Sequence, residues 1–225
     1  LIFLLIRGQK SLEVDNILSK HQRILWINIS APSLGDSLMD LSSRILLKNK
    51  KIDLFTSKKN EDLYKNDQIF NSIFTKKEDI DRIKYDLVII DSYSSRSIKV
   101  KSIIAPKISF VGVFGYFNGP EVNRILFSFH KINHLLGYIK SENEINSMAK
   151  NSISISQNDC NIVDNLVPKK YITIVLGGEW HYKIYKNWEK VIDQIILNDK
   201  KLKIIFIGSA NAKQASKELI GKYPQ

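Results

Sequence analysis

Short runs rich in β-branched and aromatic residues alternate along this chain with segments whose apolar residues recur at helical spacing. The runs predict strands over residues 24–30, 51–56, 69–74, 85–91, 107–113, 171–178 and 201–208. Strands that alternate with helices form parallel sheets covered by helices on both faces. The chain is therefore predicted to be an α/β protein with doubly wound, Rossmann-like sheets.

The segments between these runs predict the helices that would cover the sheets. In residues 37–49 the apolar side chains stand at positions 38, 41, 45 and 46, which is the spacing of one helix face. The other expected helices cover residues 58–66, 94–104, 130–139, 187–197 and 211–223.

Residues 113–129 interrupt the alternation and predict a long irregular loop, because they include Gly115, Gly119 and Pro120. Six aromatic residues crowd into or beside this segment: Phe110, Phe114, Tyr116, Phe117, Phe127 and Phe129. We predict that the loop faces a membrane surface, since interfacial aromatic residues with basic neighbours suit an anionic lipid. The alternative is that these rings pack in the core of their own domain.

A polar, Asn- and Ser-rich stretch at residues 141–161 predicts a crossing between two domains. We expect an N-terminal extension at 1–22, a complete domain at 23–165 and a partial domain at 166–225. The partial domain has two predicted strands, whereas a doubly wound sheet usually has five or six. Because the first residue is also Leu1 rather than Met, we expect the chain to be cut from a longer one.

Composition narrows the function classes. The single cysteine, Cys160, excludes an internal disulfide framework and a cysteine-based zinc site, and it favours the reducing cytoplasm. The formal net charge of +11 suits anionic partners. The four histidines complete no metal-ligand pattern, so we expect no metal. No nucleic-acid motif and no G-x-S-x-G nucleophile turn occurs in the sequence.

The first candidate site is the segment Ser33-Leu34-Gly35-Asp36, which follows a predicted strand and opens a helix. In open α/β sheets the carboxyl ends of the strands face the ligand crevice. Gly35 would allow close backbone approach, and Asp36 would point into the crevice. The alternative is that Asp36 simply caps the helix by binding its free N–H groups.

The second candidate site is the glycine turn at Gly177 and Gly178, which follows a strand and is followed by Lys183 and Lys186. Backbone N–H groups at such a turn, together with a lysine, can bind a diphosphate. The segment matches neither the P-loop nor the dinucleotide-binding glycine pattern. The alternative is a tight turn beside a solvated lysine.

The third candidate site lies after the strand at 85–91 and contains Asp91, Ser94 and Arg96. A carboxylate, a hydroxyl and a guanidinium at the carboxyl end of a strand can bind a polar substrate. The alternative is a helix cap flanked by polar surface residues.

In order and spacing, these segments resemble glycosyltransferase family 9, the ADP-heptose:lipopolysaccharide heptosyltransferases. The resemblance rests on RILWINISAPSLGDSLMDLSSRIL, KYDLVIIDSYSSRS, SFHKINHLLGY, YITIVLGGEWHYKIY and KIIFIGSANAKQASKELI, and it covers roughly residues 23–222. It implies a GT-B fold with two Rossmann-like domains, the first for the acceptor and the second for a nucleotide-sugar donor.

The resemblance also implies roles for individual residues. Asp36 matches the family's catalytic base, and either Lys183 or Lys186 matches its donor-phosphate lysine. Two departures stand out. The family's acidic residue for the donor ribose falls near Ala212 or Lys213 here, and its later D-T-G-x-x-H turn is absent from the 225 residues.

The function implied is an inverting, metal-independent glycosyltransferase without a cofactor. It would move a sugar, heptose from ADP-heptose by resemblance, to an anionic lipid-linked saccharide such as the lipopolysaccharide core. We expect a cytoplasmic protein with peripheral contact to the inner membrane. The rival interpretation is a binding protein that keeps the fold without the donor chemistry. A basic nucleic-acid binder is a third interpretation, which the lack of a motif disfavours.

Overall fold

The computed structural model of the 225-residue chain describes residues 2–31, 33–81, 84–115, 123–178 and 181–224. It divides into two compact units, residues 1–155 and 156–225. This division falls before helix α7 (Gln157–Leu166), whereas the predicted domain boundary, between residues 165 and 166, falls within its last turn. The assignment of one unit to an acceptor and the other to a donor stays a prediction.

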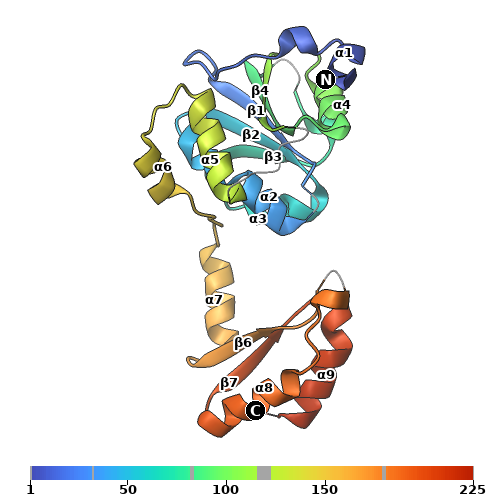
Figure 1. The fold of residues 1–225 in the computed structure, drawn as a ribbon, viewed down its shortest axis with the longest axis vertical. Helices are drawn as coiled ribbons and strands as arrows, with labels where there is room; N and C mark the ends of the chain where they lie inside the picture. The colour runs from blue at the N-terminus through green and yellow to red at the C-terminus, as the bar shows by residue number, and fades with distance from the viewer. Residues whose placement is uncertain (1, 32, 82–83, 116–122, 179–180, 225) are drawn as a thin grey trace. The chain divides into compact units, whose positions relative to one another are not determined.

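The first unit is built around a five-stranded parallel sheet (Figure 1). Its strands are β1 (Arg23–Asn28), β2 (Lys51–Thr56), β3 (Phe70–Phe74), β4 (Leu87–Ser92) and β5 (Phe110–Phe114). They lie in the order β3-β2-β1-β4-β5, so the direction of winding reverses between β1 and β4. Such a reversal opens a crevice at the carboxyl ends of the two strands, which is where α/β proteins bind ligands.

Helices cover both faces of this sheet, as the sequence pattern predicts. The helices of the unit are α1 (Ile2–Ile6), α2 (Leu34–Asp40), α3 (Glu61–Tyr64), α4 (Ser95–Ile104), α5 (Arg124–Leu135) and α6 (Glu142–Met148). Trp26 of β1 packs with Ile132 of α5 in one buried cluster, and its neighbour Leu25 packs with Ile98 of α4 in the other. Alternate residues of β1 thus enter two cores, which explains why residues 24–27 of the strand are all apolar.

Several predicted segments differ from the structure. The helix expected over 58–66 is a 3-10 helix at Lys58–Asn60 followed by α3, and the crossing expected at 141–161 contains α6 and the start of α7. The helix expected over 37–49 is α2 followed by a 3-10 helix at Ser42–Leu47. The loop expected over 113–129 ends early, because α5 begins at Arg124 rather than at residue 130. The side chain of Asn123 accepts a hydrogen bond from the N–H of Ile125 and so caps this helix.

Four of the six aromatic residues of that segment follow the alternative interpretation and pack in their own domain. Phe110, Phe114 and Phe129 are buried, and Phe127 packs against the same core and stacks on Phe114 at 5.3 Å between ring centres. Phe114 and Phe127 thus pack between α5 and the sheet, whereas Phe110 lies in the core on the face that α4 covers. The membrane prediction is therefore wrong for these packed rings. Tyr116 and Phe117, the other two aromatic residues of the prediction, lie outside the described residues.

The N-terminal residues pack on the first unit. The N–H of Val14 donates to the carbonyl of Phe110 at 2.9 Å, and the N–H of Ile17 donates to that of Leu135 at 2.7 Å. Lys101, which is buried, donates to the side chain of Gln9 at 2.5 Å. Residues 9–17 are therefore tied to β5, α4 and α5.

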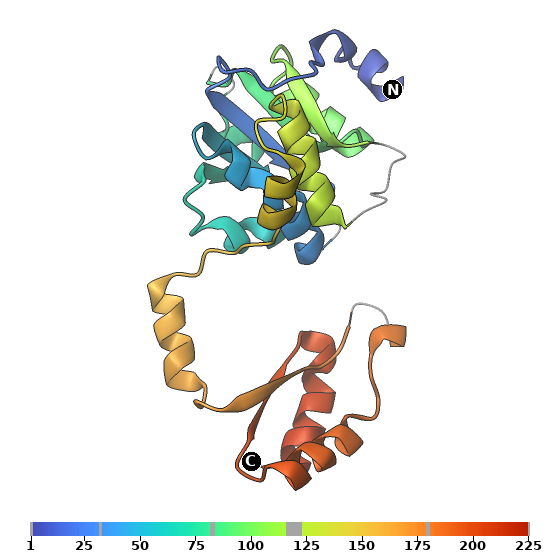
Figure 2. The same ribbon diagram turned by 60° about the vertical axis from the view of Figure 1, so that its left-hand side comes forward.

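The second unit contains two parallel strands, β6 (Tyr171–Val175) and β7 (Lys203–Ile207), as predicted. Helices α8 (Trp188–Asn198) and α9 (Lys213–Lys222) follow them, and α7 precedes them. Figure 2 shows α8 and α9 beside the two strands, and Ile174, Ile192 and Leu219 form the buried core between them. Within the described ranges, no helix is long and apolar enough to cross a membrane.

Candidate functional site

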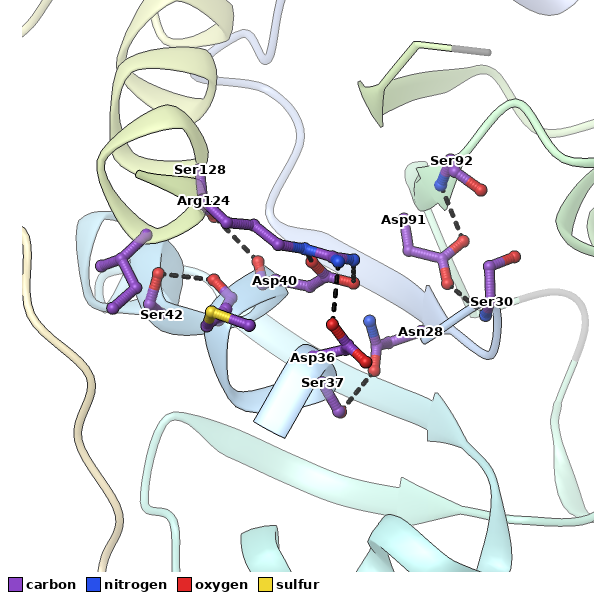
Figure 3. Close-up of polar contacts among 12 residues, drawn as sticks. Asn28, Ser30, Asp36, Ser37, Asp40, Ser42, Asp91, Ser92, Arg124 and Ser128 are labelled. Carbon is purple, nitrogen blue, oxygen red and sulfur yellow. Dashed lines mark hydrogen bonds and ion pairs between the residues drawn. The ribbon is translucent and has the colours of Figure 1, made fainter. Parts of the chain in front are cut away.

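The segment Ser33–Asp36 forms the first turn of α2 at the carboxyl end of β1 (Figure 3). Ser33 is the N-cap: its hydroxyl accepts the N–H of Asp36 at 3.2 Å. In return, one Asp36 oxygen, Oδ2, accepts the N–H of Ser33 at 3.2 Å and its hydroxyl at 2.6 Å. This reciprocal pair is a capping box, so the capping role foreseen for Asp36 is present.

Capping does not use the whole carboxylate of Asp36. Its side chain is 21% exposed, and its other oxygen, Oδ1, receives a 3.0 Å bond from Nη1 of Arg124. An ionised carboxylate has about four lone-pair sites, and three of them are filled by these contacts. Asp36 can therefore serve as a cap and still accept one further hydrogen bond.

Gly35 and Ser33 were expected to line the acceptor site beside Asp36. Gly35 is exposed, and a Cβ built on it would lie 3.9 Å from the nearest heavy atom, the Ser33 hydroxyl. The backbone of this turn is thus open to solvent. The packing of the turn does not require glycine at position 35. Close approach of a ligand, the role that the sequence suggests for Gly35, stays a prediction.

Asp40 and Arg124 belong to this site, and sequence reasoning missed both. Asp40 lies one helical turn after Asp36, and its carboxylate binds Nε and Nη2 of Arg124 at 2.6 and 2.9 Å (Figure 3). Burial raises the pKa of Asp40 to about 6, against the lowering effect of Arg124. Two carboxylates therefore share one guanidinium at the carboxyl edge of the sheet.

Asp91, the first residue of the third candidate site, lies inside the protein. Its side chain accepts the N–H groups of Ile29 and Ser30 at 2.8 and 2.6 Å, together with the N–H of Ser92 and the hydroxyl of Ser97. The residue is 1% exposed, and burial raises the pKa of this carboxyl. The Asp91 carboxylate therefore fixes the turn after β1. An acceptor substrate cannot reach its oxygens unless that turn opens.

Ser94 and Arg96, the other two residues of that predicted site, line an open cleft beside this turn. Ser94 caps α4 and bonds to the hydroxyl of Ser30 at 2.6 Å, while exposed Arg96 donates to the carbonyl of Ile29. The cleft has a volume of about 570 Å³ and is lined by Ile29, Ser30, Ala31, Ser57, Lys59, Ser94, Ser95 and Arg96. Hydroxyl groups and two cationic side chains give it a polar, positively charged lining.

The glycine turn of the second unit follows β6. Gly177 has a φ of +82°, and a Cβ there would lie 2.7 Å from Oδ1 of Asn211. Asn211 also donates to the carbonyl of Gly178 at 2.7 Å. Only glycine fits this backbone without strain. The contact with Asn211 joins the segments that follow β6 and β7.

Lys183 and Lys186, the two rival phosphate ligands, both lie on the surface after this turn. Lys183 ends a 3-10 helix at His181–Lys183, and its Cβ lies 3.2 Å from the position that a Cβ on Gly178 would take. Lys183 is thus placed against the glycine turn. No contact of the described residues places Lys186 there.

A cavity of about 330 Å³ opens at the carboxyl ends of the same two strands. Its lining is Leu176, Phe206, Ile207, Gly208, Ser209, Ala210, Ala212, Lys213 and Ser216. These residues were not predicted as ligand-binding, although Lys213 stands where the resemblance places the donor ribose acid. Among the described side chains, no group of three or more His, Cys, Asp or Glu could hold a metal ion.

The fold is shared with solved glycosyltransferases. A glycosyl transferase family 9 structure from Veillonella parvula superposes with a TM-score of 0.65 at 12% identity, over 92% of this chain and 69% of that one. The E. coli ADP-heptose lps heptosyltransferase II gives 0.63 at 16%, over 89% and 68%. The E. coli heptosyltransferase WaaC with ADP gives 0.60 at 14%, over 89% and 72%.

These likenesses confirm the predicted fold class, an α/β protein of the GT-B type with a parallel five-stranded sheet. No protein-family model matches the sequence, and no curated protein matches it. At identities of 12–16% the structural likeness establishes the fold alone.

Proposed function

We propose that this chain is part of a glycosyltransferase that moves a sugar from a nucleotide diphosphate to a saccharide hydroxyl. The observation that carries the proposal is the position of Asp36. A partly exposed carboxylate with room for one more hydrogen bond lies at the winding reversal of a sheet shared with solved heptosyltransferases. Ligands of such folds bind at that reversal.

Asp36 is the proposed general base. It would take the proton from the acceptor hydroxyl while that oxygen forms a bond to the anomeric carbon of the donor sugar. The bond from this carbon to the diphosphate breaks, and the nucleoside diphosphate leaves with the bonding electrons. Attack opposite the leaving group inverts the anomeric centre, as the family resemblance implies. The step needs no metal if N–H groups and lysines stabilise the leaving diphosphate.

The second unit is the proposed donor site. Its support is the glycine turn at Gly177 and Gly178, the nearby Lys183, and the cavity at the ends of β6 and β7. One solved structure with this fold is a heptosyltransferase with ADP, and another holds ADP-2-deoxy-2-fluoro heptose. We therefore propose ADP-heptose as the donor.

The first unit is the proposed acceptor site. The cleft beside Asp91 carries Arg96 and Lys59, which suit an anionic saccharide. A solved relative in fold is an ADP-heptose lps heptosyltransferase, so lipopolysaccharide that lacks heptose is the acceptor to test. An acceptor of this kind would bring the protein to the cytoplasmic side of the inner membrane.

The test has a binding arm and a turnover arm. Calorimetry should detect ADP binding to the chain, and Lys183→Ala should weaken it more than Lys186→Ala, because Lys183 lies against the turn. ADP release from ADP-heptose should require heptose-deficient lipopolysaccharide. ADP binding without any release by the chain would favour the rival function, a nucleotide-sugar-binding protein that lacks the chemistry. Absence of both would refute the proposal.

A further inference from the structure

Arg124 is the side chain that joins the two aspartates of α2, although it comes from another helix. Its Nη1 bonds to Asp36 at 3.0 Å, and its Nε and Nη2 bond to the two oxygens of Asp40 at 2.6 and 2.9 Å. The guanidinium carbon also lies 5.1 Å from the centre of the Phe114 ring. Three contacts from two elements thus fix the plane of the guanidinium.

Asp40 is the anchor of this arrangement. Its carboxylate is 4% exposed, so it is almost removed from solvent, while Arg124 is 29% exposed. The hydroxyl of Ser128, one turn after Arg124 on α5, donates to the backbone carbonyl of Asp40 at 2.8 Å. Helices α2 and α5 are therefore joined twice at this level. If Arg124 moved away, the carboxylate of Asp40 would remain buried without a partner, which is strongly unfavourable.

The bond to Asp36 falls on the oxygen that remains available for chemistry. Ser33 fills both lone-pair sites of Oδ2, whereas Arg124 fills one of the two on Oδ1. The one remaining site on Asp36 is thus on the oxygen that Arg124 holds. A proton taken from a substrate hydroxyl would arrive at this atom.

Resting on the proposed function, we propose that Arg124 is a positioning residue that holds Oδ1 of Asp36 in the orientation that accepts the proton of the acceptor hydroxyl. Asp40 contributes by holding Arg124. Neither Arg124 nor Asp40 needs to contact the substrate for this role.

The charged surroundings of Asp40 allow this role to be measured. Besides Arg124, the groups that act on its carboxyl are Asp36 on its own helix and Asp91 at the end of β4, and both raise its pKa, while burial raises it most. Tyr64 of α3 faces the same region and stays neutral, since burial raises its pKa to about 12. Arg124 is the group here that lowers the pKa of Asp40. Its removal should therefore make the Asp40 carboxyl bind its proton at higher pH.

The experiment compares Arg124→Gln and Arg124→Lys with a matched control, Lys84→Gln, in the full chain. Lys84 is 37% exposed and pairs with Asp53, which is 4% exposed, before the amino end of β4 and away from Asp36. The control thus also removes a half-exposed cation from a buried aspartate. Three quantities are measured: aspartate carboxyl titration by ¹³C NMR, hydrogen exchange of α2, and ADP release from ADP-heptose with heptose-deficient lipopolysaccharide.

We expect Arg124→Gln to lower kcat by roughly 10- to 100-fold, the effect of a misplaced catalytic group, with less than about a 3-fold change in the KM for ADP-heptose. The Asp40 carboxyl should titrate at higher pH, because Arg124 is the group that lowers its pKa. Arg124→Lys keeps the positive charge but not the planar guanidinium that bonds to both aspartates. It should therefore restore the carboxyl titration and only part of kcat. Lys84→Gln should change neither.

Equal kcat in Arg124→Gln and Lys84→Gln would overturn the proposal, as would an unmoved carboxyl titration. If α2 loses exchange protection in Arg124→Gln, the Lys variant decides, since it keeps the charge: full activity there refutes the need for the guanidinium. If the unaltered chain releases no ADP, the proposed function fails. Positioning by Arg124 is then judged by the titration and by the side-chain coupling constants of Asp36, which should show one rotamer in the unaltered chain and averaging in Arg124→Gln.

Discussion

Replacement of Asp91 by alanine tests whether this residue is structural. The three backbone N–H groups of Ile29, Ser30 and Ser92 would lose their acceptor, while the Ser97 hydroxyl keeps a partner in Ser94 at 3.0 Å. A buried polar group without a partner costs about 1–3 kcal/mol. Part of this cost is offset, because the variant no longer buries a charge and water can reach the opened turn. We expect a net loss of about 2–4 kcal/mol in the free energy of unfolding of the first unit.

Asp86→Ala is the matched control for this prediction. Asp86 also accepts two backbone N–H groups, those of Gln22 and Arg23 at the start of β1, at 3.1 and 3.0 Å, but it is exposed and lies before the other end of β4. Water can replace an exposed acceptor, so its loss should cost less than about 1 kcal/mol.

Hydrogen exchange of the β1 amides at 24–28 reports the unfolding of the first unit without interference from the second. Because about 1.4 kcal/mol corresponds to a factor of ten, Asp91→Ala should speed this exchange roughly 30- to 700-fold. Equal effects of Asp91→Ala and Asp86→Ala on this exchange would refute the structural role of the buried Asp91 carboxylate. Asp91 would then return to the list of candidate acceptor ligands.

Three further predictions address other parts of the chain. Gly137→Ala should cost the first unit roughly 1 kcal/mol of stability through left-handed backbone strain alone, since Gly137 has a φ of +79° and no atom lies within 4 Å of an added Cβ. Gly177→Ala should cost the second unit more than this, because its added Cβ would also meet Asn211. Equal losses in urea denaturation would argue against the contact with Asn211. The pKa of Asp40 is raised to about 6 from 3.8, so the folded state binds a proton more tightly than the unfolded state, and this contribution to stability is lost as pH rises from about 4 to 6. The free energy of unfolding, relative to that of Asp40→Asn, should therefore fall by up to about 3 kcal/mol over that window. A difference between the two proteins that does not change with pH would contradict this prediction. Burial lowers the pKa of Lys101 to about 8 from 10.5, so the folded state holds fewer protons above pH 8 and stability should rise toward pH 10; Lys101→Met, measured by the same denaturation, should remove this rise.

Strands β1, β2, β4 and β5 were predictable because nearly all of their residues are buried, which gives each a short run of strand-forming residues in the sequence. Residues 51–56 form β2 as expected, since a run of only six residues that contains Ile52, Leu54 and Phe55 is too short for a helix and typical of a strand. The start of α5 was missed because glycine, proline and aromatic residues before it indicate a loop. The signal that could have placed it was Asn123, a favourable N-cap directly before Arg124.

The candidate site was predictable only where it is local in sequence. The turn from Ser33 to Asp36 follows from strand, cap and helix, whereas the bond from Arg124 to Asp36 joins residues 88 positions apart. No periodicity carries such a contact, which depends on how α5 packs beside α2. Likewise, sequence placed Asp91 at the end of β4 but could not tell that its side chain turns inward to the N–H groups after β1.

Asp36→Asn is the decisive variant for the role of Asp36 as the base of a glycosyl transfer. Asparagine keeps the shape and one acceptor oxygen of the cap but cannot take up the proton. ADP release from ADP-heptose in the presence of heptose-deficient lipopolysaccharide should fall by about 10²- to 10⁴-fold, the range of acid–base catalysis, while ADP binding and exchange protection of α2 stay unchanged. Near-normal ADP release by a folded Asp36→Asn variant would contradict the account and leave Asp36 as a helix cap.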